Sequence, residues 1–85
     1  MDGLELRRKR ALYRAHHRGT KELDLILGRY AEENVPGMDE ARLAGFEKLL
    51  SLQDPDIDQW IRGRQAPDGV ASVVADVRAF YALKD

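Results

Sequence analysis

Apolar positions recur every three or four residues along most of this 85-residue chain, in separate runs divided by glycine and proline. Side chains at i, i+3, i+4 and i+7 share one face of an α-helix, whereas a half-buried strand would alternate every second residue. The pattern predicts helices over about residues 4–16, 20–34, 39–52, 54–62 and 70–83. We therefore expect an all-α fold, a single-domain compact bundle of five short helices spanning residues 1–85.

Residues that favour helix ends stand between these runs. Thr20 is a good N-cap for the second predicted helix, and residues 35–37 (Val-Pro-Gly) predict a turn after it. Asp54 followed by Pro55 predicts an N-cap with proline at the first helical position, and Gly63 predicts a C-cap. The expected connections are therefore short, as in packed helical bundles.

The apolar stripes of the five predicted helices supply the expected core. A stripe of this kind is buried when the helix packs against its neighbours. The members, in chain order, are Leu4, Ala11, Leu12, Ala15, Leu23, Ile26, Leu27, Tyr30, Leu43, Phe46, Leu49, Leu50, Ile57, Trp60, Ile61, Val70, Val73, Val74, Val77 and Tyr81.

Charge is unevenly spread, although the net charge is only −1. Residues 1–21 carry seven Lys or Arg against two acidic residues, and residues 22–85 carry seven against thirteen. A basic end on an acidic body predicts oriented docking to a partner. The chain has no cysteine, which excludes disulfides, thiolate metal sites and cysteine nucleophiles.

The chain shows no targeting or membrane segment. No apolar run approaches the roughly 18 residues that a membrane-spanning helix needs. The first residues have neither a secretory pattern nor an Arg-rich, acid-poor leader. We expect a cytoplasmic bacterial protein without membrane insertion, and consider the mitochondrial matrix the weaker alternative.

The acidic run Asp54, Asp56 and Asp58 resembles the start of an EF-hand loop. That loop needs Gly at its sixth position and Glu at its twelfth, and these positions hold Gln59 and Gln65. We interpret the run as helix capping and a solvated face, where acids favour the positive end of the helix dipole. No metal site is expected here.

Catalytic and cofactor-binding patterns are also absent from the sequence. His16 and His17 are adjacent, so on a helix they point about 100° apart and cannot share a metal as i, i+4 pairs do. Ser51 and Ser72 have no evident base partner. No Gly-rich phosphate loop or dinucleotide fingerprint is present. We expect no catalytic residues and no cofactor held by this chain.

One group of residues combines chemistry with a structural break. Arg18 and Glu22 flank Gly19, where the first predicted helix gives way to the second. Glycine permits unusual backbone angles and close approach of another surface, and the arginine fork suits carboxylates or phosphates. Two interpretations stay open at this point: a local ion pair that closes the helix–turn–helix, or an exposed corner that binds a partner.

The order and spacing of several short motifs resemble the SdhE-like family of FAD assembly factors for succinate dehydrogenase. The resemblance covers about residues 7–63, and the last helix matches only as a generic amphipathic helix. The matching segments are Arg7-Arg8-Lys9-Arg10, Arg18-Gly19-x-x-Glu22-x-Asp24, Leu25-Ile26-Leu27, Phe46-Glu47-x-Leu49-Leu50 and Asp54-x-Asp56-Ile57-x-x-Trp60. The chain departs from many members at His17, where they have Arg, and at Ile57, where they have Leu.

The resemblance implies a non-catalytic assembly factor of about five helices. It would bind the flavoprotein subunit of succinate dehydrogenase, and in some bacteria that of fumarate reductase, and promote the covalent bond between FAD and a histidine of that subunit. The implied partner-binding residues are Arg18, Gly19 and Glu22, supported by Asp24. FAD is then attached to the partner. We expect a monomer whose basic first helix (Arg7, Arg8, Arg10 and Arg14) steers docking.

Two other functions compete with this one. A helix–turn–helix with a basic first helix could contact nucleic-acid phosphates. However, its recognition helix would carry Glu22, Asp24, Glu32 and Glu33, which suits a major groove poorly, so we expect no nucleic acid as a partner. The second alternative is an antitoxin-type regulatory protein that binds some other protein, and the sequence leaves it open.

Overall fold

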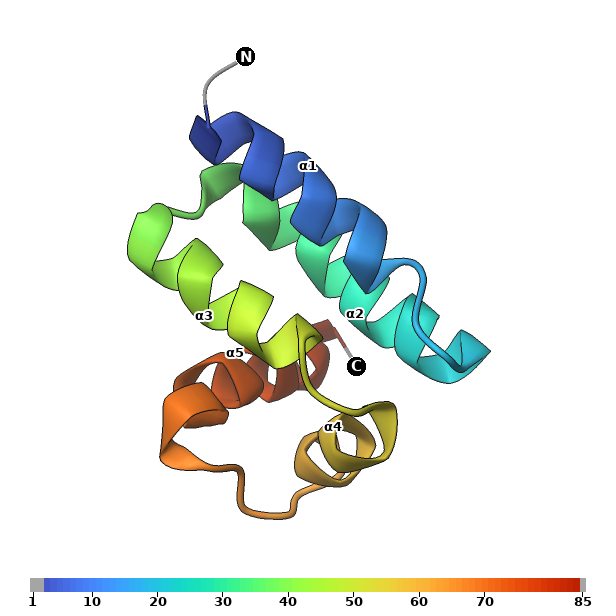
Figure 1. The fold of residues 1–85 in the computed structure, drawn as a ribbon. Coiled ribbons are helices and arrows are strands. Elements are labelled where there is room, and N and C mark those ends of the chain that lie inside the picture. Colours follow the sequence, from blue (N-terminus) through green and yellow to red (C-terminus); the bar gives the residue numbers. More distant parts are fainter. Residues whose placement is uncertain (1–2, 85) are drawn as a thin grey trace.

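The computed structural model describes the backbone of residues 3–84 and the side chains of residues 3–82. All regular structure in this part of the chain is helical, as predicted (Figure 1). The helices are α1 (Gly3–Ala15), α2 (Lys21–Asn34), α3 (Glu40–Leu50), α4 (Asp54–Ile61) and α5 (Asp68–Lys84), with a 3₁₀ turn, η1 (Val35–Gly37), after α2.

Helices α1 and α2 form an antiparallel hairpin, and α3 packs against α1 (Figure 1). Helix α5 lies against α3 and reaches α2, while α4 packs mainly on α5. The sequence placed the start of α5 at Val70, and the structure starts it two residues earlier, directly after Pro67. The amide of Val70 donates to the Pro67 carbonyl at 3.0 Å, which closes this first turn. None of the described helices is long and apolar enough to cross a bilayer.

Side-chain and backbone caps fix the helix ends. The Thr20 hydroxyl accepts from the Leu23 amide at 3.2 Å, which confirms Thr20 as the N-cap of α2. Gly63 follows α4 with a φ of 123°, the left-handed region that glycine tolerates best. The amides of Gly63 and Arg64 donate to the carbonyls of Trp60 and Gln59, at 3.1 and 2.9 Å. These two bonds form a Schellman motif, so the predicted C-cap glycine is confirmed.

The N-terminus of α4 differs from the prediction. Gln53 occupies the N-cap position and makes no side-chain capping bond. Asp54 is the first residue of the helix, and its carboxylate turns instead toward the loop between α1 and α2. A guanidinium group lies within reach there, and a charged partner binds a carboxylate more strongly than backbone amides do. The prediction of Asp54 as an N-cap was therefore wrong.

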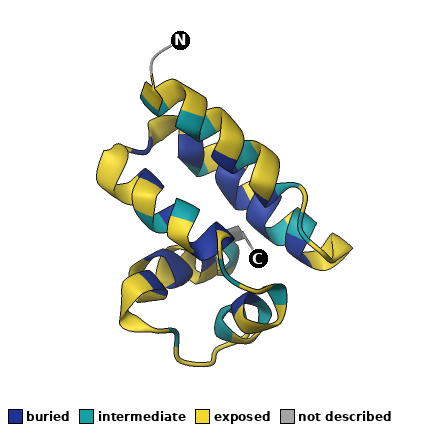
Figure 2. Cartoon of the chain, in the orientation of Figure 1, coloured by how far each residue is buried: buried dark blue, intermediate teal, exposed yellow. Residues whose placement is uncertain are grey.

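The core lies where the predicted stripes meet between the helices (Figure 2). The aromatic centre is Tyr30, whose ring lies 5.4 Å from that of Phe46 and edge-on to Phe80 at 5.7 Å. Such tilted and edge-on pairs are favourable beyond their buried area. Ala31, Val35 and Met38 are buried as well, which the sequence did not predict. The partly buried members of the predicted stripes are Leu4, Leu12, Ile26, Trp60, Ile61 and Tyr81.

Candidate functional site

Arg18 lies in the loop between α1 and α2, and its side chain points back into the molecule, with only 10% of it exposed. Its Nε and Nη2 atoms contact Oδ1 of Asp54 at 2.8 and 2.6 Å. Its Nη1 donates to the Leu50 carbonyl at 2.6 Å and its Nη2 to the Leu52 carbonyl at 3.0 Å. All three guanidinium nitrogens are therefore engaged with the connection between α3 and α4.

Gly19 completes this attachment through its backbone. Its amide donates to Oδ2 of Asp54 at 2.6 Å, so the two oxygens of one carboxylate hold two consecutive residues. A Cβ atom at Gly19 would lie 2.6 Å from the same Oδ2 atom. The backbone angle of Gly19 is not in the left-handed region. Glycine is required here for the close approach of Asp54, and not for the special backbone angles that the sequence suggested.

Asp24 supports the loop from the first turn of α2. Its carboxylate accepts a short hydrogen bond from the backbone amide of Arg18. We refer to Arg18, Gly19, Asp24 and Asp54 together as the clasp. Because its members come from the loop, from α2 and from α4, the clasp fixes the position of the loop relative to both helices.

Glu22 lies beside the clasp in the first turn of α2, and its side chain is 64% exposed. Its Oε1 is 3.2 Å from Nη2 of Arg62 at the end of α4. Arg62 in turn donates from Nε to Asp58 at 2.8 Å. The hydrogen bond to Asp58 and the charges of Asp58 and Glu22 raise the pKa of Arg62. Glu22 is thus an accessible carboxylate that is held loosely by an exposed arginine.

Two shallow hollows adjoin Gly19, and both are lined in part by Asp54. One, of about 340 Å³, lies between the start of α2 and α4 and is lined by Gly19, Glu22, Asp58 and Arg62 among others. The other, of about 360 Å³, is lined by His17, Arg18 and the α3–α4 connection. We call the clasp, Glu22, Arg62 and these two hollows the Arg-Gly corner. Gly19, Glu22 and Arg62 are exposed at its surface.

The four arginines predicted to steer docking do not behave alike. Arg7 makes a two-pronged contact with Glu47, from Nη2 at 2.7 Å and from Nε at 3.2 Å. This hydrogen bonding raises the pKa of Arg7 and lowers that of Glu47. Arg8 donates to the Met38 carbonyl at 2.8 Å. These two arginines hold α1 to α3 and to the segment after η1, while Arg10 and Arg14 are exposed on α1.

The structure brings four of the predicted site residues together, namely Arg18, Gly19, Glu22 and Asp24. Arg18 and Glu22 each pair with a residue of α4. The local ion pair considered from the sequence is therefore not what closes this turn. Asp54 and Arg62 were missed as site residues. Asp54 stands in the acidic run that was interpreted as a cap and solvated face, and Arg62 had no distinguishing signal.

The two adjacent histidines have separate surroundings. Nε2 of His16 is 3.1 Å from Glu32, and the His16 ring packs against Gly28. Nδ1 of His17 donates to the Tyr13 carbonyl at 2.6 Å, and the two rings stack at 3.9 Å. Across residues 3–82, no three His, Cys, Asp or Glu side chains are placed to hold a metal ion.

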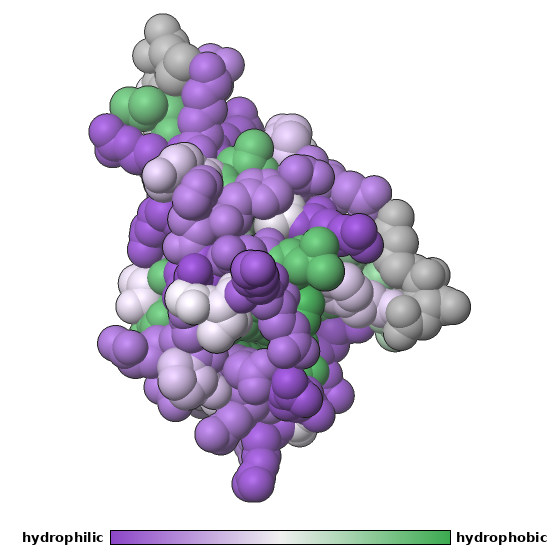
Figure 3. Space-filling model, turned by 90° about the vertical axis from the view of Figure 1, so that its right-hand side faces the viewer, coloured by the Kyte–Doolittle hydropathy of each residue, from purple (hydrophilic) through white to green (hydrophobic). Residues whose placement is uncertain are grey.

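The face of the molecule seen in Figure 3 is mostly hydrophilic, with separate small apolar areas. Fold and corner together define a class: a small helical domain with a charged corner that is anchored by contacts within the chain. A family model described as "Flavinator of succinate dehydrogenase" matches residues 9–81. The chain belongs to this family.

Curated relatives agree with this assignment. The chain is 40% identical over 63 residues to the "FAD assembly factor SdhE" of Acetobacter pasteurianus, which covers 74% of this chain and 58% of the relative. It is 39% identical over 67 residues to the protein of the same name from Pseudomonas aeruginosa, covering 79% of this chain and 76% of the relative. It is also 44% identical over 64 residues to the mitochondrial "Succinate dehydrogenase assembly factor 2" of Arabidopsis thaliana, which covers 74% of this chain and 34% of the relative.

Proposed function

We propose that this protein assists the covalent attachment of FAD to the flavoprotein subunit of succinate dehydrogenase, with the corresponding subunit of fumarate reductase as a second client. Family membership and the names of the relatives support this role. The observation that carries it is the Arg-Gly corner, where Glu22 and the Gly19 backbone are accessible beside a turn that is anchored by four polar contacts to Arg18.

The proposed mechanism is conformational. The flavin and a histidine of the client are the reacting groups, and this protein contributes no catalytic group. It would bind an immature form of the client and hold the histidine and flavin in reactive geometry, since correct positioning removes part of an activation barrier. FAD is then held by the client and not by this chain. The same proposal places the protein in the bacterial cytoplasm.

The contacts in the Arg-Gly corner favour different roles for its residues from those that the sequence suggested. Arg18 and Asp24 are positioning residues, because their polar groups are used to anchor the loop. Glu22 and the Gly19 backbone are the groups proposed to contact the client, with Arg62 orienting Glu22. Arg10 and Arg14 are the arginines proposed to steer docking, because Arg7 and Arg8 are engaged within the chain. A nucleic-acid function is not favoured, since those two contacts remove part of the expected phosphate-binding surface.

The test compares covalent flavin in the client subunit, measured by fluorescence after denaturing electrophoresis. Four reactions are compared: one without this protein, one with the wild type, one with Glu22→Gln and one with Asp56→Asn. Asp56→Asn is the control, because it also removes one exposed negative charge. We expect Glu22→Gln to remain folded and to lose most of the stimulation, roughly tenfold in initial rate, as for loss of one charge-assisted contact. Full stimulation by Glu22→Gln would refute the assigned contact, and equal loss in the control would reduce it to a general charge effect.

A further inference from the structure

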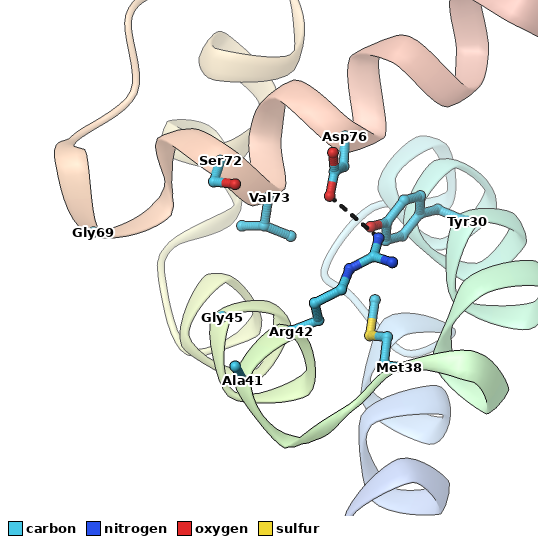
Figure 4. A pocket seen from close by; sticks show the side chains of 9 residues that line it. All are labelled: Tyr30, Met38, Ala41, Arg42, Gly45, Gly69, Ser72, Val73 and Asp76. Carbon is cyan, nitrogen blue, oxygen red and sulfur yellow. Dashed lines mark hydrogen bonds and ion pairs between the residues drawn. The ribbon is translucent and has the colours of Figure 1, made fainter.

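A third hollow lies between α3 and α5 and shares no lining residue with the Arg-Gly corner (Figure 4). Its volume is about 330 Å³. Met38 and Val73 form apolar parts of its wall, and Tyr30 enters it from α2. Arg42 of α3 and Asp76 of α5 stand together at one end. We call this hollow the α3–α5 cleft.

The hydroxyl of Tyr30 is an unusual group at this place. The residue is 1% exposed, its ring packs in the aromatic centre of the core, and the hydroxyl has no acceptor for its proton within hydrogen-bond distance. Burial raises its pKa, the charge of Asp76 acts in the same direction, and Arg42 opposes the shift. The hydroxyl therefore keeps its proton at neutral pH. A buried donor without an acceptor costs folding free energy, so an incoming acceptor would recover part of that cost.

The ion pair beside this hydroxyl is weakly held. Nη2 of Arg42 lies 3.4 Å from Oδ2 of Asp76, and the two side chains are 54% and 48% exposed (Figure 4). An exposed pair of this kind contributes little to stability. Arg42 reduces the upward shift in the pKa of Tyr30 through its charge and a side-chain contact, so its guanidinium lies beside the buried hydroxyl. The long Arg42 side chain is therefore a group that a ligand would displace to reach the donor.

The floor of the cleft on the α3 side is open because residue 45 is glycine. A Cβ atom at Gly45 would meet nothing within 4 Å. A side chain can therefore be started at this position without a clash at its Cβ, and a longer one would extend into the space of the cleft. This position gives a direct way to fill the cleft while leaving the surrounding residues unchanged.

We propose that the α3–α5 cleft binds a neutral carboxamide group carried on a short apolar body. The amide oxygen would accept from the Tyr30 hydroxyl and Arg42, the amide nitrogen would donate to Asp76, and the apolar part would lie against Met38 and Val73. An amide complements both members of the ion pair, whereas the attraction of a carboxylate to Arg42 is offset by repulsion from Asp76, and the attraction of an ammonium group to Asp76 by repulsion from Arg42. The amide group belongs either to an Asn or Gln side chain of a partner protein or to a free small molecule. This site is independent of the proposed role in FAD attachment.

The first experiment compares three fragments of similar size, propionamide, propionate and propylamine, added to the isotope-labelled protein. We expect propionamide to shift the backbone amide resonances of Gly45, Gly69 and Ser72 in a saturable way at millimolar concentration, as is usual for so small a ligand. Propionate and propylamine should shift them much less at equal concentration. Absence of saturable shifts with propionamide, or equal shifts with all three fragments, would overturn the proposal.

Two variants test the assigned groups. Tyr30→Phe removes the unpaired hydroxyl and should fold at least as well, while propionamide binds roughly fivefold more weakly, the loss expected for one hydrogen bond. Gly45→Leu fills the cleft and should abolish the shifts. Ala44→Leu, at the neighbouring exposed position of α3, is the matched control and should leave them intact. Unchanged propionamide binding by Gly45→Leu would place the fragment elsewhere and refute the site.

A final binding experiment distinguishes the two sources of the amide group. Wild type, Gly45→Leu and Ala44→Leu are compared for binding to the purified flavoprotein subunit by calorimetry. Weaker binding by Gly45→Leu alone would assign the cleft to an Asn or Gln side chain of that subunit. Equal binding by all three, with the fragment results above, would assign it to a free small amide. The fragment shifts are measured without the flavoprotein. They therefore test the cleft even if the protein proves to have no role in FAD attachment.

Discussion

Arg18 and Arg42 differ in how strongly their side chains are bound within the fold. Arg18 in the clasp is 10% exposed and makes four contacts of 2.6–3.0 Å. Arg42 at the α3–α5 cleft is 54% exposed, and its ion pair with Asp76 has the longer distance of 3.4 Å. All guanidinium nitrogens of Arg18 bind groups within the fold, so few of its hydrogen-bond donors remain for a partner. The second contributes little to the fold and stays available for a ligand.

The largest expected effect is loss of the clasp. Arg18→Met leaves the Asp54 carboxylate and two carbonyls without their cationic partner, in surroundings that are mostly closed to water. We expect a loss of about 3 kcal/mol in the free energy of unfolding, at the lower end for a broken, largely buried ion pair. Urea unfolding of the two proteins measures this difference.

Arg42→Met is the control for this prediction and should change the stability by less than about 0.5 kcal/mol. Equal losses in the two variants would remove the contrast between the two arginines.

A smaller effect is expected from adding one carbon atom at each of two glycines. Gly19→Ala places a Cβ 2.6 Å from Oδ2 of Asp54, so the carboxylate must withdraw from both Arg18 and the loop amide. We expect about 1–3 kcal/mol of destabilisation, as for other overpacked sites. Gly45→Ala should instead stabilise the protein by about 0.5–1 kcal/mol, because it meets no atom and lies within a helix. Thermal unfolding of both variants gives the comparison, and a stable Gly19→Ala would contradict the role assigned to Asp54.

The ion pair of Arg7 and Glu47 is intermediate between these two sites, and it should be visible in the pH dependence of stability. The pKa of Glu47 in the folded protein is lowered from its ordinary value of 4.5. Its contribution is therefore present above that value and is lost as the pH falls through the lower pKa of the folded state. Unfolding measured at a series of pH values should show a weaker acid dependence in Glu47→Gln than in the wild type. Parallel curves would indicate that the pair does not contribute.

The smallest stability effect is expected at the exposed edge of the corner. Arg62→Gln removes the partner of Glu22, but both side chains are mostly exposed, so the free energy of unfolding should change by less than about 0.5 kcal/mol. If Arg62 orients Glu22 toward the client, the rate of flavin attachment should fall severalfold, less than with Glu22→Gln. A fluorescence assay of covalent flavin tests this, and an unchanged rate would limit the contact to Glu22 itself.

Local patterns were sufficient for the helices and for most of the core. The spacing of Leu23, Leu27 and Tyr30 predicts a buried face of α2, and the hydroxyl of Thr20 predicts where that helix begins, because both depend on neighbours in the chain. The shared location of Arg18, Gly19 and Glu22 follows from the same local reasoning.

Contacts between distant parts of the chain could not be predicted in this way. Aspartate is a residue type that favours helix N-caps, so the local sequence assigned Asp54 to that role. Its carboxylate is turned toward Arg18 only because α4 packs beside the α1–α2 loop. The role of Gly19 was misjudged for the same reason, since the atom that excludes a Cβ belongs to Asp54. The unpaired hydroxyl of Tyr30 likewise depends on what α3 and α5 place around it.

The clasp joins residues that are 35 and 36 positions apart in the chain. A nascent or proteolysed chain that stops before Asp54 contains the whole Arg-Gly-x-x-Glu signature, yet it lacks the carboxylate that binds both the Arg18 side chain and the Gly19 amide. Such a fragment should not compete with the full-length protein for a client. If the Arg-Gly corner contacts the client as proposed, the protein would become able to bind it only after the fourth helix has been synthesised and has packed beside the loop.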